Sequence, residues 1–399
     1  MNNNHEDKPL PLKGIRVLDF GRYIAGPYCA ALLADFGADV IRVEKLTGSE
    51  DRFVTPVSDD GAGALFLQMN RNKRCMAFKP TSESGREIVR KLVATSDIVV
   101  ANLPDRALEK LGLSYPQLRE IKPNIILTTV SAFGDKGEWT DRVGFDSVAQ
   151  AMSGAAYMSG DDTPSRSQAP WVDFSTALHC AFGTVLALLS RKQTGDGQQV
   201  SASLLASALT VMNATLIEQH VNSPNRAPLG NDAATASPIG MFKTKDGWVS
   251  CHVVGQPIFV RLARLIDCEE WIADPRFSSD LKRGENQEII LEKLRTWCAD
   301  RSTEQAMNEF AIEQIPAGPV LSPQQALDHP ASQALDLLTP VDYKGLDKKA
   351  PIARSPVQLS ASSTTLDSPP ELGAQTHDIL ESLGYDESSI ELLKQDGTI

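Results

Sequence analysis

One aspartate in this chain stands where a carboxylate could do covalent chemistry. Asp173 lies in the segment Q-A-P-W-V-D-F-S-T-A-L-H, directly before a long apolar run that predicts a helix. An aspartate in this position is typical of a helix N-cap, which accepts a backbone N–H bond, and spacing alone favours that structural role. The position also suits a nucleophile, because a helix N-terminus supplies donors and a favourable dipole. We expect those donors to stabilise the oxyanion of an attacked thioester.

Other charged residues have the same two interpretations, structural and functional. Asp146 lies in R-V-G-F-D-S-V-A-Q and stays ambiguous, whereas Asp19 lies inside an apolar strand and is interpreted as a buried structural carboxylate. Basic residues gather in N-R-N-K-R (residues 70–74), and Arg42 and Lys45 flank the end of a predicted strand. These cations indicate either a solvated surface or a site that receives phosphates.

Several familiar kinds of site are excluded by their missing motifs. The first β-α turn reads G-R-Y-I-A-G-P, so the second glycine of a dinucleotide fingerprint is absent, and Pro27 removes a backbone donor. The six histidines are isolated in sequence, without H-E-x-x-H or a Cys/His cluster, so we expect no metal site. A P-loop and a G-x-S-x-G elbow are also missing.

The elements that must position these residues alternate between strands and helices. Residues 15–20 and 39–43 predict parallel strands, joined through a helix over residues 28–36. Further strands are predicted at residues 97–100, 124–130 and 198–203, with helices at residues 86–95 and 104–111. This order predicts a doubly wound, mostly parallel, Rossmann-like α/β sheet. Residues 176–190 are apolar almost all round, which predicts a central helix buried on every side.

The chain is long enough for two domains. It has 399 residues, and its composition shifts to Asn, Pro, Ala and Ser near residue 222. We predict a large domain over residues 1–222, a linker over 223–237, and a smaller α+β domain over 238–330. Residues 331–399 are expected to return and complete the large domain.

Composition also limits location and partners. The net charge of −12 argues against wholesale binding to nucleic acid or to anionic membranes. Six scattered cysteines indicate free thiols in a reducing compartment. Residues 1–11 lack the apolar core of a secretory signal, and no run of about 18 apolar residues predicts a membrane span. We therefore expect a cytoplasmic protein.

The motifs together carry a family resemblance. P-L-x-G-I-R-V-L-D-F, A-G-P, L-A-D-F-G-A-D-V-I-R-V-E-K, N-R-N-K-R, V-A-Q-A-M-S-G and R-K-Q-T-G-D-G-Q-Q-V occur in this order. The chain thereby resembles the class III CoA-transferases, a family that includes formyl-CoA transferase, carnitine CoA-transferase and α-methylacyl-CoA racemase. The resemblance implies an interlocked homodimer. It also implies that coenzyme A or acyl-CoA acts as a substrate and that no cofactor is bound permanently.

The resemblance places the catalytic carboxylate on Asp173. It implies that this carboxylate attacks a donor acyl-CoA, forms a mixed anhydride and then an aspartyl-CoA thioester, and finally passes CoA to a small carboxylic acid. It also implies contacts with CoA from a set of matching positions: Ile24, Ala25, Lys45, Phe78, Lys79, Asn102, Leu103, Pro104, Lys110, Arg142, Phe145 and Asp146. The family often has arginine where Lys110 stands, and lysine keeps the charge but loses the bidentate fork.

Two other functions stay open. A 2-methylacyl-CoA racemase on the same fold would need a histidine before Asp146, but Phe145 stands there and cannot move a proton. A CoA-binding protein without turnover would have no use for Asp173 in its matching position. The sequence leaves the acyl group undefined, and residues 229–238 are expected to border the acyl pocket.

Overall fold

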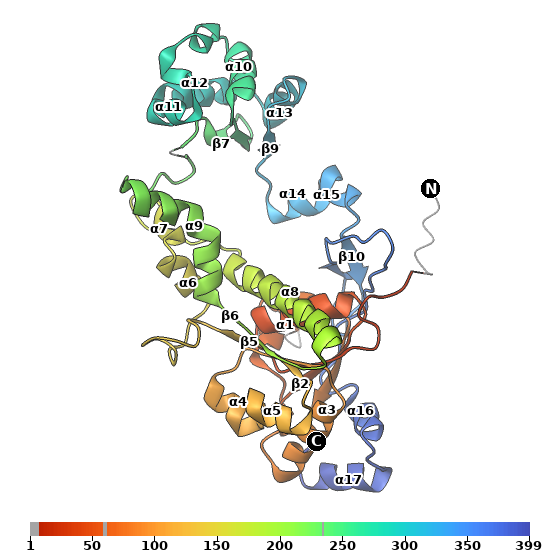
Figure 1. The fold of residues 1–399 in the computed structure, drawn as a ribbon. Coiled ribbons are helices and arrows are strands. Elements are labelled where there is room, and N and C mark those ends of the chain that lie inside the picture. The colour runs from red at the N-terminus through yellow and green to blue at the C-terminus, as the bar shows by residue number, and fades with distance from the viewer. Residues whose placement is uncertain (1–7, 59–61, 234) are drawn as a thin grey trace. The chain divides into compact units, whose positions relative to one another are not determined.

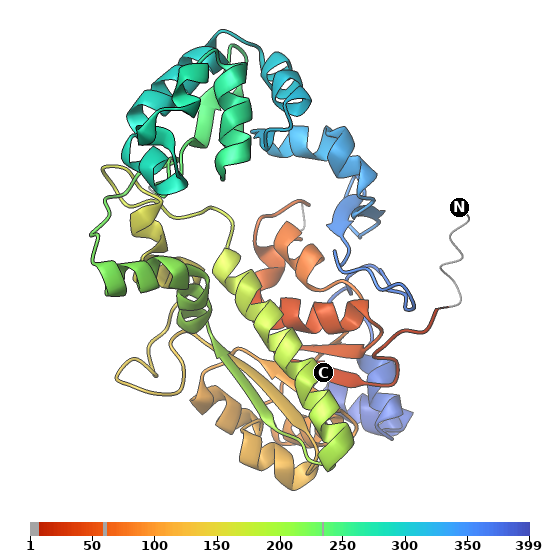
Figure 2. The same cartoon turned by 45° about the horizontal axis from the view of Figure 1, so that its top comes forward.

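The computed structural model describes residues 8–58, 62–233 and 235–399 (Figures 1 and 2). Residues 1–7 lie outside the described residues, and they make up most of the 1–11 segment in which the sequence predicts no secretory signal. Residue 234, within the segment 229–238 that is expected to border the acyl pocket, also lies outside them. Contacts divide the chain into two compact units. Unit 1 comprises residues 1–153, 168–213 and 335–399, and unit 2 comprises residues 154–167 and 214–334.

A six-stranded sheet forms the centre of unit 1. Its strand order is β3-β2-β1-β4-β5-β6, and every neighbouring pair is parallel. The strands are β1 (Arg16–Asp19), β2 (Asp39–Glu44), β3 (Lys73–Ala77), β4 (Ile98–Ala101), β5 (Ile126–Ser131) and β6 (Gln199–Ser203). Successive strands are added outward from β1 on one side and from β4 on the other, so the strand order switches direction between β1 and β4, as in doubly wound dinucleotide folds. The predicted parallel α/β sheet is confirmed.

Helices cover both faces of the sheet, because strands buried on two sides need an apolar layer on each. One face packs against α1 (Ala25–Asp35) and α8 (Trp171–Thr194). The other face packs against α3 (Glu83–Ala94), α4 (Asp105–Leu111), α5 (Tyr115–Ile121), α16 (Thr376–Ser382) and α17 (Glu387–Gln395). Figure 1 shows α16 and α17 beside α3, so the end of the chain returns to the first half of the sheet.

The returning chain also covers the edge strand β3. The N–H of Cys75 donates to Oε1 of Gln375 at 2.7 Å, and the N–H of Ala77 donates to Oγ1 of Thr376 at 3.0 Å. These bonds satisfy backbone donors that an open sheet edge would leave free. A hairpin of β10 (Leu338–Val341) and β11 (Ala350–Ala353) packs on α2 (Ala64–Met69), which follows the short 3-10 helix η1 (Glu50–Phe53).

The basic segment of residues 70–74 is folded into the interior by ion pairs. Lys73 is 5% exposed, and its Nζ lies 2.7 Å from Oδ2 of Asp19. Arg71 is fully buried against Asp35. Both predictions for this segment, a solvated surface and a phosphate site, are therefore wrong for these two cations, whose charges are already neutralised inside the protein.

Arg42 belongs to the same buried system. Its guanidinium is fully buried, and its Nη2 donates to both carboxylate oxygens of Asp51, at 3.0 and 2.7 Å. It also lies 3.6 Å from Asp19 and 3.1 Å from Glu44. Burial alone would raise the pKa of Asp19, but the charges of Lys73 and Arg42 outweigh it and lower that pKa. The interpretation of Asp19 as a buried structural carboxylate is confirmed.

Unit 2 has a core of its own. An antiparallel sheet of β7 (Ile239–Lys243), β8 (Trp248–His252) and β9 (Ala317–Pro319) packs against α10 (Gln256–Leu265), α12 (Gln287–Ala299) and α13 (Thr303–Ile312). The other elements of this unit are α7 (Ala155–Met158), η2 (Glu269–Ile272), η3 (Pro275–Phe277), α11 (Asp280–Glu285), α14 (Pro323–Asp328), α15 (Pro330–Ala334) and the second half of α9 (Leu204–Asn222), whose first half belongs to unit 1.

Helix α8 differs from its prediction as a helix buried on every side. One side packs on the sheet and on α1, and Figure 2 shows it lying along that face. The other side is open in the single chain: Leu178, Phe182, Leu186 and Leu189 are 47–66% exposed. By length and composition alone α8 is long and apolar enough to cross a membrane, a feature that the sequence analysis did not predict. The same composition is expected of a core helix that packs on a sheet, as α8 does.

Candidate active site

The implied CoA contacts follow the carboxyl ends of parallel strands. Ile24 and Ala25 come after β1, Lys45 after β2, and Phe78 and Lys79 after β3. Asn102, Leu103 and Pro104 come after β4, while Arg142, Phe145 and Asp146 come after β5. Because parallel strands end at a common edge, the topology brings these segments to one side of the sheet.

The loop after β1 is held in place by Asn102. The side chain of Asn102 accepts from the N–H of Arg22 at 2.7 Å and donates to the carbonyl of Arg22 at 2.8 Å. The backbone approach is close: a Cβ on Gly26 would lie 3.1 Å from the Cα of Gly21 and 3.2 Å from Oδ1 of Asn102. Asn102 therefore positions the loop that carries Ile24 and Ala25, a role that its amide performs without a ligand.

Two aromatic residues join this loop to the segment before α6 (Asp146–Met152). Tyr23 adopts a φ of 60°, which is rare for a bulky residue, and its ring meets that of Phe145 edge-on at 5.7 Å. Phe145 is 60% exposed. Residues with a strained backbone conformation cluster at active sites and ligand-binding sites. The sequence analysis did not select Tyr23, since left-handed backbone at a non-glycine residue leaves no signal in sequence.

Asp146 caps helix α8. Its Oδ2 accepts from the N–H of Val172 at 2.8 Å and from the N–H of Asp173 at 3.1 Å. The formal N-cap of α8 is Pro170, which makes no side-chain cap bond. The prediction that Asp173 caps its own helix is therefore wrong, because Asp173 lies inside the first turn and Asp146 performs the capping.

This arrangement also corrects the predicted source of oxyanion donors. The N–H groups of Val172 and Asp173 are engaged by Asp146, and that of Trp171 donates to the carbonyl of Ala169. The next N–H, from Phe174, already bonds within the helix to Pro170. The first turn of α8 thus has its donors occupied, and the helix N-terminus does not present them to a substrate.

Asp173 itself is half-buried beside a second carboxylate. Burial, followed by the negative charge of Asp146, raises the pKa of Asp173 to about 7, from an ordinary value of 3.8. The aromatic ring of Phe174, next in the chain, packs edge-on against Tyr28 of α1 at 4.8 Å. A carboxyl group with such a pKa is a candidate for chemistry, because a strong shift caused by burial and a specific charged neighbour is typical of functional sites.

The other implied contact residues differ in their access to solvent. Phe78 is fully buried in the core, so its side chain is closed to a ligand, whereas Lys79 is exposed. Lys45 is half-exposed and forms an ion pair with Glu50. Pro104 and Lys110 are exposed at the two ends of α4, and Leu103 is partly buried in the core. Arg142 is exposed and stacks on Trp139, with 3.9 Å between its guanidinium and the ring centre.

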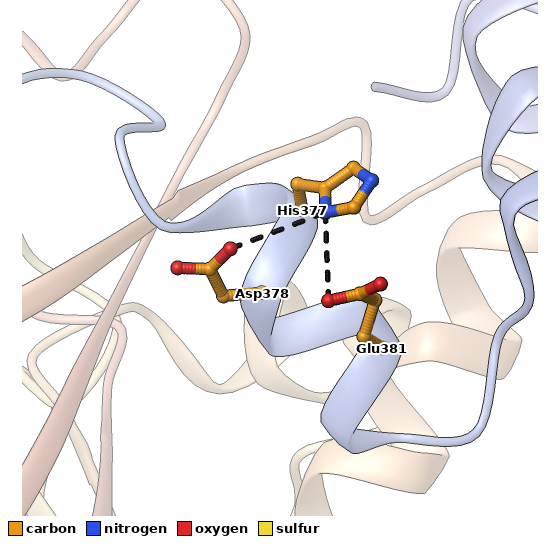
Figure 3. A group of neighbouring side chains, drawn as sticks. All are labelled: His377, Asp378 and Glu381. Atoms are coloured by element: carbon orange, nitrogen blue, oxygen red, sulfur yellow. Dashed lines mark ion pairs between the residues drawn. The ribbon is translucent and has the colours of Figure 1, made fainter.

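A separate group of side chains gathers around His377, which is isolated in sequence. Its Nδ1 lies 3.9 Å from Asp378 and 3.7 Å from Glu381, as Figure 3 shows. Its Nε2 lies 2.9 Å from Oε2 of Glu387. The spacing would suit a metal ion, but the same exposed carboxylates lie within ion-pair distance of the imidazole itself. Ion pairing alone accounts for the arrangement, so it carries no chemical assignment.

Comparison with known proteins identifies the family. The sequence pattern of CoA-transferase family III matches residues 12–376. The chain belongs to CoA-transferase family III. Like the named relatives in this family, it is an enzyme of the CoA-transferase type, and the resemblance seen in the sequence is confirmed.

Relatives and solved structures agree with this membership. The chain is 30% identical to succinyl-CoA:glutarate CoA-transferase of Mus musculus, over 98% of this chain and 91% of that protein. It is 29% identical to formyl-CoA:oxalate CoA-transferase of Rhodopseudomonas palustris, over 97% of this chain and 96% of that protein. The crystal structure of a CaiB/BaiF family protein from Brucella suis matches with a TM-score of 0.83 and 28% identity, covering 94% of this chain and 100% of that one.

Proposed function

We propose that the enzyme transfers CoA from an acyl-CoA donor to a small carboxylic acid, with Asp173 as the nucleophile. The carboxylate attacks the thioester carbonyl, the carbon–sulfur bond breaks, and a mixed anhydride and CoA thiolate result. The thiolate then attacks the aspartyl carbonyl of the anhydride, which releases the donor acid as its carboxylate and leaves an aspartyl-CoA thioester. The acceptor carboxylate repeats both steps in reverse, which restores Asp173.

The raised pKa of Asp173 is the observation that carries this proposal. A pKa of about 7 leaves much of this carboxyl group ionised at neutral pH, and it makes the ionised form more basic than an ordinary aspartate. A more basic carboxylate is the better nucleophile towards an acyl carbon. The reaction uses only the acyl-CoA and the acid, so it needs no metal or redox group.

The proposed CoA site uses the segments at the carboxyl edge of the sheet. Lys45, Lys79, Lys110 and Arg142 are exposed or half-exposed cations that could meet the phosphates of CoA. Asn102, Leu103 and Pro104 would form the wall along the pantetheine arm, while the buried residues Ile24, Ala25 and Phe78 would contribute mainly their backbone. Phe145 carries no proton to exchange, which favours transfer over racemisation at this position.

The open side of α8 supports the proposed homodimer. Its exposed apolar residues recur at helical spacing over about three turns, and a stripe of this kind is typical of a surface that another chain covers. We propose a second copy of the same chain as its partner. We also propose that unit 1 is the large CoA-binding domain, that unit 2 is the smaller one, and that the dimer is cytoplasmic.

Trapping the enzyme-bound intermediate tests the assignment of Asp173. Wild-type enzyme incubated with succinyl-CoA and then with hydroxylamine is expected to yield an aspartyl hydroxamate at residue 173, detected by peptide mass spectrometry. Asp173→Ala should lose turnover by about a thousandfold or more, while still binding CoA in calorimetry. Asp141→Ala, at an exposed position of the same unit, is the control. Near-normal turnover of Asp173→Ala would remove the assignment.

A screen of acids identifies the substrates. The named relatives act on succinyl-CoA with glutarate and on formyl-CoA with oxalate. Succinyl-CoA and formyl-CoA are therefore the first donors to test, against succinate, glutarate, oxalate, carnitine and branched acids as acceptors. Deuterium exchange at the α-carbon of a 2-methylacyl-CoA would instead indicate racemase activity.

A further inference from the structure

The first turn of α8 is completed by a residue from another helix. A helix leaves its first N–H groups without intrahelical partners, and a local side chain usually satisfies one of them. In α8 the N-cap residue is Pro170, which offers no side-chain acceptor. Two of these N–H groups instead donate to a single oxygen of Asp146, more than twenty residues earlier in the chain.

We propose that Asp146 is a positioning residue for the transfer reaction, because its carboxylate caps α8 and fixes the turn that presents Asp173. This inference rests on the proposed function of Asp173. It also replaces the expected role of Asp146 as a CoA contact, since both of its oxygens are already bound by protein donors.

Asp146 is itself held rigidly. It is the first residue of α6, it is 8% exposed, and its Oδ1 accepts from Nε2 of Gln150 at 2.5 Å. Helix α6 packs against α8, so the carboxylate lies between two helices that each supply it with donors. Gln150 follows Asp146 by one helical turn, a spacing that brings the two side chains together. Asp146 thus links the geometry of α6 to that of Asp173.

The cap also places a negative charge beside the nucleophile. The elements packed against the start of α8 hold few other charges. On α1 the titratable groups are Tyr28, Cys29 and Asp35, and Asp35 is paired with Arg71. On α6 the only charged residue is Asp146, and β5 and β6 contain none. Further along α8 stand His179, Cys180, Arg191 and Lys192. Asp146 is the charge that acts on Asp173, in addition to burial.

This juxtaposition has a consequence for the reaction. Two neighbouring carboxylates repel each other, and the repulsion ends when Asp173 becomes a neutral anhydride. Asp146 would therefore favour the attack as well as orient it. A variant that keeps the cap but loses the charge separates the two effects. Asp146→Asn retains a carbonyl oxygen for the α8 donors, whereas Asp146→Ala retains neither oxygen nor charge.

The test combines hydrogen exchange with the pH profile of turnover. In Asp146→Ala, amide exchange at Val172 and Asp173 is expected to be about fivefold faster, as for the loss of a helix cap. Turnover of this variant is expected to fall to about a tenth of the wild-type value or lower. In Asp146→Asn those amides should stay protected, while the acid limb of the pH profile moves about one pH unit towards acid. Asp386→Ala removes a comparable cap from α17, where Asp386 accepts from the N–H of Ser389 at 2.8 Å, and it should change neither readout.

The outcomes distinguish this inference from the proposed function. If Asp173→Ala abolishes turnover but both Asp146 variants keep wild-type exchange and a wild-type pH profile, the positioning role of Asp146 is wrong and the nucleophile stands. If Asp173→Ala remains active, the proposed function fails, whatever the Asp146 variants do. If amide exchange at Val172 and Asp173 is as fast in Asp146→Asn as in Asp146→Ala, the cap requires the negative charge. The claim that capping and charge act separately is then wrong.

Discussion

Replacing Asp173 by asparagine should stabilise the protein, and only at neutral or alkaline pH. In the folded chain the pKa of Asp173 is about 7, above its ordinary value of 3.8. Between these values the folded chain keeps the proton that the unfolded chain has lost. Folding stability therefore falls as the pH rises through this window, and the full penalty is present above pH 7.

The size of the penalty follows from the two pKa values. A difference of this size corresponds to roughly 4 kcal/mol if the whole shift acts on folding. Asp173 is only half-buried and solvent screens part of the interaction, so we expect about 2 kcal/mol. Asparagine has nearly the same shape and removes the charge, and its own burial cost does not depend on pH. The difference between the effects at pH 8 and pH 4 isolates the ionisation of Asp173.

The assay is denaturant unfolding of wild type and Asp173→Asn at pH 4 and pH 8. The variant should gain about 2 kcal/mol more at pH 8 than at pH 4, which is on the order of 4 °C in a thermal midpoint for a domain of this size. Asp141→Asn removes a charge from an exposed position and should show no such difference. Equal effects at the two pH values, or a larger gain at pH 4, would refute the argument that Asp173 is held in an unfavourable charge state.

Two further predictions concern the buried ion pairs and the open side of α8. Lys73→Met should destabilise unit 1 by about 3 kcal/mol, because it leaves Asp19 buried without its closest cation. Arg74→Met on the same strand breaks a half-exposed ion pair with Asp39 and should lower the free energy of unfolding by less than about 1 kcal/mol. Equal losses of unfolding free energy for the two variants in urea titrations would contradict this reasoning. Phe182→Asp should prevent self-association, measured by light scattering, because it places a charge on the open side of α8. Leu392→Asp, at a similarly exposed position on α17, should leave self-association unchanged. A monomeric wild-type protein would contradict the proposed dimer.

Apolar strands and helices could be predicted from the sequence, but β3 could not. Strands β1, β2 and β4 each contain consecutive Val, Ile or Leu residues, which leave a clear signal. Strand β3 begins with Lys73 and Arg74 and therefore has the composition of a surface segment. Its place in the sheet depends on Asp19 and Asp39, whose carboxylates pair with these cations from strands far away in sequence. Periodicity does not report such pairs.

The candidate site was predictable as a set of positions but not as a set of roles. Family resemblance selected Asp173 as the catalytic carboxylate and Asp146 as a CoA contact, and nothing in the sequence placed the two at the same helix. The exchange of roles, in which Asp146 caps the helix, depends on two hydrogen bonds between segments that are distant in sequence. Capping rules apply to residues within a few positions of a helix start, so they favoured Asp173 instead. Gln150 could have been noticed from its spacing of four residues after Asp146.

The contrast between Asp19 and Asp173 explains how one fold assigns different work to two interior carboxylates. Burial acts on both in the same direction and would raise both pKa values. Asp19 has Lys73 and Arg42 beside it, so its pKa falls and its charge is permanent. Asp173 has an anion beside it instead, and its pKa rises to about 7. A carboxylate surrounded by cations is too stable to attack an acyl carbon, and one that faces another carboxylate gains by doing so. The placement of neighbouring charges, rather than burial, therefore separates the structural carboxylate Asp19 from Asp173, the carboxylate that we propose as the nucleophile.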